Sequence, residues 1–344
     1  MAKSPMAVRA ASAIALMCFL FFILYAGHGA IACTIAGCVF EIFRELVNVG
    51  MQEGNVDREI PLYRSLQWLW FAVAACATYS ADNLKAPMFV GLKLSEASRL
   101  GALLQFIVPY RAYVVMLMYS TAFMLTVLSF KEGYYSTQLH ILAFTSLALS
   151  LFMVQLKALI FNLYTGLFWF AVPLLLVICN DTAAYFAGKA CARRFIDKPL
   201  IELSPKKSWE GFIGAMMATL FSAALTPKMF RRFLSDRQWL YLTCTYEQWT
   251  SLGEACTPPP HFRDDALGVL GLHCIALALF ASVVAPFGGF MASAIKRAYK
   301  LKDFDSFIPG HGGLMDRLDC QFLMSVFTCA HVVTFLPTDP TCSS

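Results

Sequence analysis

The sequence predicts an all-α fold, a polytopic membrane helical bundle of about nine transmembrane helices. The first reason is composition. Hydrophobic residues make up 58% of the 344 residues, charged residues only 14%, and the mean hydropathy is +0.61; soluble domains carry roughly a quarter charged residues. The second reason is that the apolar residues gather into runs near the length of about 20 residues that crosses a bilayer. A soluble protein of this length could not bury so much apolar surface.

The expected spans follow one another along almost the whole chain. The first two form a tight hairpin that turns at Gly27-His28-Gly29, and the third ends in a polar stretch. The segment 86–110 is ambiguous, because it could instead lie at the membrane interface. The expected spans are 12–26, 29–43, 66–82, 111–129, 138–160, 165–187, 209–226, 267–291 and 320–336.

Lys and Arg residues predict the orientation, because cytosolic loops are enriched in them. The loop 188–207 and the short loop around Lys300 are both basic, and two expected spans separate them, so they share one side. The N-terminus carries Lys3 and Arg9 and lies six spans before the first of these loops, hence on the same side. All three therefore face the cytosol, although basic residues between positions 85 and 111 then fall on the opposite side.

The longest loop, about 227–266, would face away from the cytosol. It contains Cys244 and Cys256, which form a disulfide or stay as two free thiols in a compartment that permits disulfides. Most other cysteines lie in apolar runs, where cysteine behaves as a small hydrophobic residue. No Cys or Cys/His spacing indicates a zinc site.

The segment SAIKRAYKLKDFDSFIPGHGGLMDRLDC, Ser293–Cys320, differs from the rest of the chain in its charges and glycines. Lys296 and Arg297 fall at the expected cytosolic end of a helix, and Lys302 follows in the loop. Basic residues in such a loop are usually topology signals. Orientation depends on positive charge, however, and does not explain the four aspartates in this segment.

The second half of this segment indicates a site for a phosphorylated ligand. His311 is followed by Gly312 and Gly313, and adjacent glycines let backbone N–H groups approach an anion. Asp316 and Asp319 are three residues apart, so both carboxylates project to one side of a helix. Two carboxylates beside a basic, glycine-lined cavity suit Mg²⁺ that carries nucleotide phosphates. His311 alone would be read as a hydrogen-bonded loop residue.

Asn180 and Asp181 lie inside an otherwise apolar expected span. Charged residues at membrane depth are costly and usually face a cavity or a functional site. The alternative is a polar pair that joins two helices.

Shortly after this pair, the stretch Ser204–Gly211 is expected to open the next helix, with Pro205 at or near its start. Lys206 and Lys207 beside a helix N-terminus would form an anion site. Glu210 would either compensate the helix dipole or act as a ligand.

These residues resemble the phosphatidate cytidylyltransferase family, also called CDP-diacylglycerol synthase. The family signature is S-x-x-K-R-x4-K-D-x-small-x2-I-P-x-H-G-G-x-x-D-R-x-D, which this chain follows in order and spacing from Ser293 to Asp319. The stretches VPLLLVICNDTAAY, LSPKKSWEGFIG and APFGGFMAS also resemble the eukaryotic members, and LYRSLQWLW with the N-terminal hairpin does so more weakly. Two positions depart. Asp305 stands where the signature has a small residue, and Gly289 stands where bacterial-type relatives have an acidic residue.

The resemblance implies that CTP and phosphatidate react to give CDP-diacylglycerol and pyrophosphate, in phospholipid biosynthesis. We expect catalytic roles for Asp316, Asp319, Asp181, Lys302, Asp303 and His311. We expect Mg²⁺ as cofactor, held by Asp316, Asp319 and Asp181. We expect substrate contacts from Ser204, Lys206, Lys207, Glu210, Lys296, Arg297, Gly312, Gly313 and Arg317.

The resemblance also sets expectations for organisation and partners. Residues 1–164 would form the N-terminal transmembrane helices, and 165–344 the catalytic transmembrane region with cytosolic active-site loops. CTP would arrive from water, while phosphatidate keeps its acyl chains among the membrane lipids. The eukaryotic style implies the endoplasmic reticulum. The small net charge of +5 gives no indication of nucleic-acid binding, and a homodimer is left open.

Two alternatives use similar residues. A CTP-dependent polyprenol kinase would transfer the γ-phosphate instead of the cytidylyl group. A transporter of phosphorylated solutes, which is not an enzyme, would line its pathway with Asp181 and the lysines, but no inverted repeat of broken helices is visible. A CDP-alcohol phosphatidyltransferase is disfavoured because its D-G-x2-A-R-x8-G-x3-D-x3-D pattern is absent.

Overall fold

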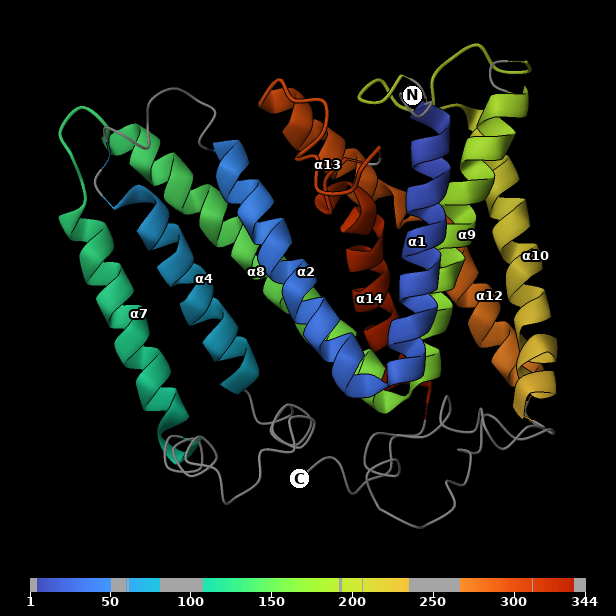
Figure 1. Ribbon diagram of the computed structural model, residues 1–344, viewed down its shortest axis with the longest axis horizontal. Coiled ribbons are helices and arrows are strands. Elements are labelled where there is room, and N and C mark those ends of the chain that lie inside the picture. The colour runs from blue at the N-terminus through green and yellow to red at the C-terminus, as the bar shows by residue number, and fades with distance from the viewer. Residues whose placement is uncertain are drawn as a thin grey trace. The chain divides into compact units, whose positions relative to one another are not determined.

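A computed structural model of the chain (Figure 1) describes residues 5–50, 60, 62–80, 108–191, 194–205, 207–234, 267–310 and 312–336. Most of the described residues are helical. Outside the helices they contain two isolated β-bridges, Pro199–Ser208 and Ile308–Gly312, and no strand. The predicted all-α class is therefore confirmed.

Within the described part of the chain, six helical segments are long and apolar enough to cross a membrane, each at the position of an expected span. They are Arg111–Leu128, Tyr135–Thr165, Leu167–Cys191, Trp209–Met229, Gly268–Ala298 and Met315–Phe335. The chain is thus a polytopic membrane protein. Helices also occupy the other three expected positions, as α1 (Pro5–Ala26), α2 (His28–Gly50) and α4 (Tyr63–Ser80). The count of nine spans and the orientation stay predictions.

The chain forms two compact units that do not follow the sequence order. The first contains Met1–Lys157 together with Phe304–Leu314, and the second contains Ala158–Asp303 together with Met315–Ser344. The short segment Phe304–Leu314, in the middle of the motif-rich region, is therefore assigned to the unit built by the N-terminal helices. The expected functional division at residue 164 stays a prediction.

In the first unit, α1 and α2 form the predicted hairpin. Gly27 separates them with φ = +89°, a conformation that glycine adopts without steric cost. Further along α2, Phe43 stacks on Phe71 of α4 with ring centroids 4.7 Å apart and meets Trp68 edge-on at 5.3 Å. These aromatic contacts fasten the second half of α2 to α4.

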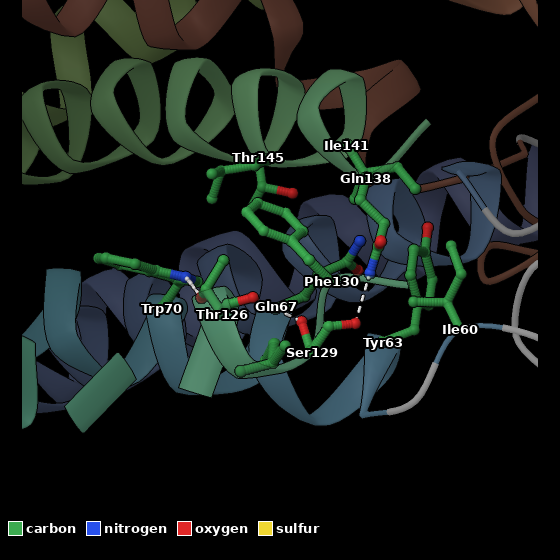
Figure 2. Close-up of a pocket in the computed structure, with 12 residues that line it drawn as sticks. Ile60, Tyr63, Gln67, Trp70, Thr126, Ser129, Phe130, Gln138, Ile141 and Thr145 are labelled. Atoms are coloured by element: carbon green, nitrogen blue, oxygen red, sulfur yellow. Dashed lines mark hydrogen bonds between the residues drawn. The ribbon is translucent and has the colours of Figure 1, made fainter. Parts of the chain in front are cut away.

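The helices α4, α7 (Arg111–Leu128) and α8 (Tyr135–Thr165) line a pocket whose residues are all uncharged (Figure 2). Trp70 Nε1 donates to Thr126 Oγ1 at 3.1 Å. The Gln138 amide donates to the Ser129 carbonyl and accepts from the Lys131 N–H, both at 2.9 Å. Neutral hydrogen bonds of this kind satisfy buried polar groups between apolar helices.

The second unit contains α9 (Leu167–Cys191), α10 (Trp209–Leu234), α12 (Leu267–Val283), α13 (Pro286–Ala298) and α14 (Met315–Phe335). Helix α9 packs against α10, α12 and α14 around a core that includes Trp169, Leu176, Leu277 and Met324. The side-chain amide of Asn162 donates to the Ser325 carbonyl at 2.9 Å and ties the end of α8 to α14. This packing places the polar ends of α9, α13 and α14 in one unit.

Candidate active site

Helices α9 and α10 approach closely just beyond Asp181. A Cβ atom added to Gly214 would lie 2.7 Å from the Cβ of Ala187, and one added to Gly211 would lie 3.2 Å from the Ala184 carbonyl oxygen. Glycine at both positions therefore permits a spacing that larger residues would widen. The close contact fixes the first turn of α10 beside the second half of α9.

Ser208, and not Pro205, marks the start of α10. The helix begins at Trp209, and the Ser208 hydroxyl accepts a hydrogen bond from the Gly211 N–H at 3.2 Å, the usual N-cap contact. Pro205 lies in a turn in which the Lys207 N–H donates to the Ser204 carbonyl at 3.0 Å. The predicted start of this span at residue 209 is therefore confirmed, and Pro205 lies four residues before it.

Glu210, in the first turn of α10, holds the preceding loop. Its Oε1 atom accepts from the backbone N–H groups of Phe195 and Ile196, both at 3.0 Å. These bonds order part of the basic loop that precedes α10. A contact between Glu210 and substrate stays a prediction.

The neighbouring residues Asn180 and Asp181 have different environments. Asn180 is buried, and its Oδ1 accepts from the Thr219 hydroxyl of α10 at 3.3 Å, which is the helix-joining alternative. Asp181 is exposed and interacts electrostatically with Asp319 and Arg317 of α14 and with Lys207. The charged member of the pair is therefore the one that reaches the other charged candidates.

Asp319 lies where α13 and α14 are in close contact. Its Oδ1 accepts from the Cys320 N–H at 2.7 Å, and its Oδ2 is 3.3 Å from the place that a Cβ on Gly289 would occupy. The Lys207 ammonium is 3.7 Å from that same place and 4.4 Å from the centre of the Phe290 ring. Glycine at position 289 thus lets a carboxylate and a lysine come close to the backbone of α13.

Asp316 forms an ion pair with Lys296 of α13, with 2.6 Å between Oδ1 and Nζ. The side chains are 5% and 17% exposed, so water screens this pair little. Arg297, at the end of α13, and Arg317, in the first turn of α14, are exposed, as are Lys302 and Asp303 in the following loop.

The glycine-rich segment belongs to the first unit and forms a closed turn. Ile308 and Gly312 exchange backbone hydrogen bonds of 2.9 and 3.2 Å, and Gly310 and Gly312 have φ of +76° and +85°. The Gly312 N–H is therefore already used within the turn. His311 and Lys206 lie outside the described residues, and the roles expected for the whole set stay predictions.

Sequence reasoning missed two residues of α2 that contact this segment. Glu45 is fully buried, and its Oε1 accepts from the Leu314 N–H at 2.6 Å. Arg44 reaches Asp305 with 3.5 Å between Nη2 and Oδ2. Arg44 and Glu45 stand directly after an apolar run, which could have marked them as candidate functional residues. Their contacts could not be predicted, because Glu45 and Leu314 are 269 residues apart and such a contact leaves no local sequence pattern.

The donor set around Asp181 fits a magnesium ion that arrives with phosphates. Among the residues that the structure describes, no group of three or more His, Cys, Asp or Glu side chains could hold a metal ion. Asp181 and Asp319 nevertheless interact as like charges, and a cation between them would offset their repulsion. Magnesium sites in nucleotide enzymes commonly use one or two carboxylates and complete the shell with phosphates and water.

Comparison with known proteins agrees with this chemistry. The model of the cytidylyltransferase family matches residues 7–335. The chain is 34% identical to the "Probable phosphatidate cytidylyltransferase" of Dictyostelium discoideum, over 98% of this chain and 72% of that protein. It is 32% identical to "Phosphatidate cytidylyltransferase 1" of Homo sapiens, over 96% and 72%, and to "Phosphatidate cytidylyltransferase 2" of Mus musculus, over 96% and 74%.

Proposed function

Because the chain belongs to the cytidylyltransferase family, we propose that it transfers the cytidylyl group of CTP to phosphatidate, giving CDP-diacylglycerol and pyrophosphate. The relatives with this activity in their names match over nearly the whole chain, which supports the reaction. The observation that carries it in the structure is the group formed by Asp181, Asp319 and Lys207. It combines the carboxylates of Asp181, inside α9, and Asp319, near the start of α14, with a lysine just before α10, an arrangement suited to phosphate groups.

The reaction needs no activated protein nucleophile. The phosphate of phosphatidate is anionic near neutral pH, and one of its oxygens attacks the α-phosphorus of CTP while pyrophosphate leaves. Catalysis then consists of bringing two anions together and stabilising the charge that develops on the leaving group. This explains why the candidate residues are cations and carboxylates rather than a serine or cysteine with a base.

In this proposal, some lysines bind the phosphates of CTP and others bind the phosphate of phosphatidate. Lys207 stands beside Gly289 and would bind a CTP phosphate, together with Lys206. Lys296, paired with Asp316, would contact the phosphatidate phosphate at the end of α13, and Lys302 would contact either substrate from the loop. His311 would donate a hydrogen bond to a phosphate oxygen.

We propose Mg²⁺ as the cofactor, held by Asp319 and Asp181, with Asp316 as a third candidate. When bound, it would neutralise the triphosphate and stabilise the leaving pyrophosphate. Asp316 differs from the other two because Lys296 already contacts its carboxylate, so its part would include orienting that lysine.

We further propose residence in the endoplasmic reticulum with the site facing the cytosol. The basic loops support this orientation, and the eukaryotic resemblance supports the compartment. The orientation places Cys244 and Cys256, which lie outside the described residues, in the lumen. Labelling of either residue by a membrane-impermeant maleimide in sealed, right-side-out microsomes would contradict it.

The deciding experiment follows the label of CTP into lipid. Purified protein in detergent receives Mg²⁺, phosphatidate and CTP labelled at either the α- or the γ-phosphate. We expect the α-label in the lipid fraction and the γ-label in pyrophosphate. In a parallel reaction, polyprenol replaces phosphatidate as the acceptor. Lipid that carries the γ-label in that reaction would instead identify a polyprenol kinase. No transfer to either acceptor would overturn the proposed function.

A further inference from the structure

The signature segment Phe304–Leu314 is attached to the N-terminal hairpin by three polar contacts. The Leu314 N–H donates to Glu45 of α2 at 2.6 Å, and Asp305 pairs with Arg44 of the same helix at 3.5 Å. The Ser12 hydroxyl of α1 donates to the Pro309 carbonyl at 2.8 Å. The contacts lie at the start, middle and end of the segment, so they constrain all of it.

Glu45 provides the most deeply buried side chain among these contacts. It is 0% exposed, and its carboxyl group stands directly against Gly313. A Cβ atom on Gly313 would lie 2.7 Å from Glu45 Oε2 and 3.0 Å from the Asp305 nitrogen. A side chain at position 313 would therefore displace the Glu45 carboxyl group, independently of any approach by a phosphate.

The Arg44–Asp305 pair is the weaker contact. Its side chains are 41% and 34% exposed, and such pairs contribute little to stability. Asp305 also accepts from the Ser306 N–H at 2.7 Å, which closes a local turn. Asp305, which stands where the signature has a small residue, therefore contacts both its own segment and α2.

We propose that Glu45 is a positioning residue for nucleotide transfer, which sets the conformation of the glycine segment and of the backbone that leads into Asp316. The inference rests on the proposed function for its kinetic part, whereas the attachment of the segment to α2 stands by itself. Leu314 is directly followed by α14, so its bound N–H fixes the chain two residues before Asp316. A loop held at this point presents the backbone of Gly312 and Gly313 in one arrangement.

The test compares three substitutions of Glu45 with one control. Glu45→Ala removes the acceptor and leaves the Leu314 N–H unpaired, and Glu45→Asp keeps the carboxyl group but shortens its reach. Glu45→Gln keeps an oxygen of the same shape in the same place. Glu41→Gln is the control, because Glu41 lies one turn earlier on α2 and pairs with Arg44 at 2.8 Å, outside the glycine segment.

Two measurements are made on the full-length protein in detergent. Hydrogen–deuterium exchange of the peptide 304–314 reports the attachment itself. We expect exchange at least about tenfold faster in Glu45→Ala and Glu45→Asp, and unchanged in Glu45→Gln and Glu41→Gln. The KM for CTP should rise about tenfold in the first two variants and stay within about twofold in the other two.

The outcomes separate positioning from a general loss of structure. A lower kcat with an unchanged KM for CTP would mean fewer folded molecules, and it would overturn the proposal. Unchanged exchange in both Glu45→Ala and Glu45→Asp would overturn the attachment. If Glu45→Ala does not fold, Glu45→Asp and Glu45→Gln still decide. If the unsubstituted protein transfers no cytidylyl group, the proposed function fails, while the exchange result still tests the contact with α2.

Discussion

The pocket between α4, α7 and α8 and the charged group around Asp181 are two polar regions among apolar helices, and they differ in how their polar atoms are satisfied. In the pocket, Trp70 and Gln138 donate to oxygens of the protein itself, and no lining residue is charged. Around Asp181, two carboxylates interact as like charges. The neutral region has no charge to balance. The repulsion between two carboxylates is offset in part by the nearby Lys207 and Arg317, and a bound cation would offset it further.

The largest loss of activity is expected from a substitution of Asp316. Asp316→Asn should lower kcat/KM at least about a hundredfold, because it removes a carboxylate charge from the phosphate-binding region. Asparagine keeps an oxygen that can accept from Lys296, so the protein should remain folded. Turnover with Mg²⁺ and CTP measures the first effect, and the unfolding temperature in detergent measures the second.

The matched control for Asp316→Asn is Asp305→Asn. Asp305 belongs to the same sequence motif, Ser293–Asp319, but pairs with the partly exposed Arg44, and the effect of its substitution should be no more than about threefold. Near-normal turnover of Asp316→Asn at saturating Mg²⁺ would remove Asp316 from the site.

Lys207→Ala should have the next largest effect. Its ammonium lies beside Gly289 and the Asp319 carboxylate, so its loss should raise the KM for CTP about tenfold. The measurement is initial rate against CTP concentration at fixed phosphatidate. A KM and kcat for CTP equal to those of the unsubstituted protein would return Lys207 to the role of a topology signal.

Two adjacent glycines of α13 separate an effect on the charged group from an effect on helix packing. Gly289→Ala places a methyl group 3.3 Å from Asp319 Oδ2 and 3.7 Å from Lys207 Nζ, so activity should fall severalfold with little change in stability. In Gly288→Ala the methyl group would clash with the Asp319 carbonyl oxygen and push α13 from α14. That change should lower the free energy of unfolding by about 1–3 kcal/mol as well as activity. Equal losses of stability in the two variants would show that position 289 only packs helices.

The smallest effect on activity is expected in the neutral pocket. Gln138→Leu removes two hydrogen bonds between α8 and the end of α7, which should cost about 1–3 kcal/mol of stability. Because the pocket serves architecture in this interpretation, kcat and both KM values should stay within about twofold. A selective rise of one KM would instead make the pocket a substrate site.

The helices and the reaction class could be predicted because both depend on local patterns. Apolar runs predicted the positions of the nine described helical segments that coincide with expected spans, and the long motif from Ser293 to Asp319 indicated the family before any geometry was known. The start of α10 at residue 209 was also predicted, although the residue that caps it is Ser208, whose hydroxyl accepts from the third residue after it, and not Pro205. Glu45 could not be connected to Leu314, since a contact across most of the chain has no periodicity.

The attachment of residues 304–314 to α2 has a consequence for how the chain is made. Glu45 leaves the ribosome 269 residues before Leu314, its hydrogen-bond donor, so the acceptor must wait while the intervening helices are inserted. Contacts this distant in sequence form late and slowly. A chain released before residue 314 would contain all the described helices except α14 and still leave a buried carboxyl group without this donor, which would make such a product a substrate for membrane quality control.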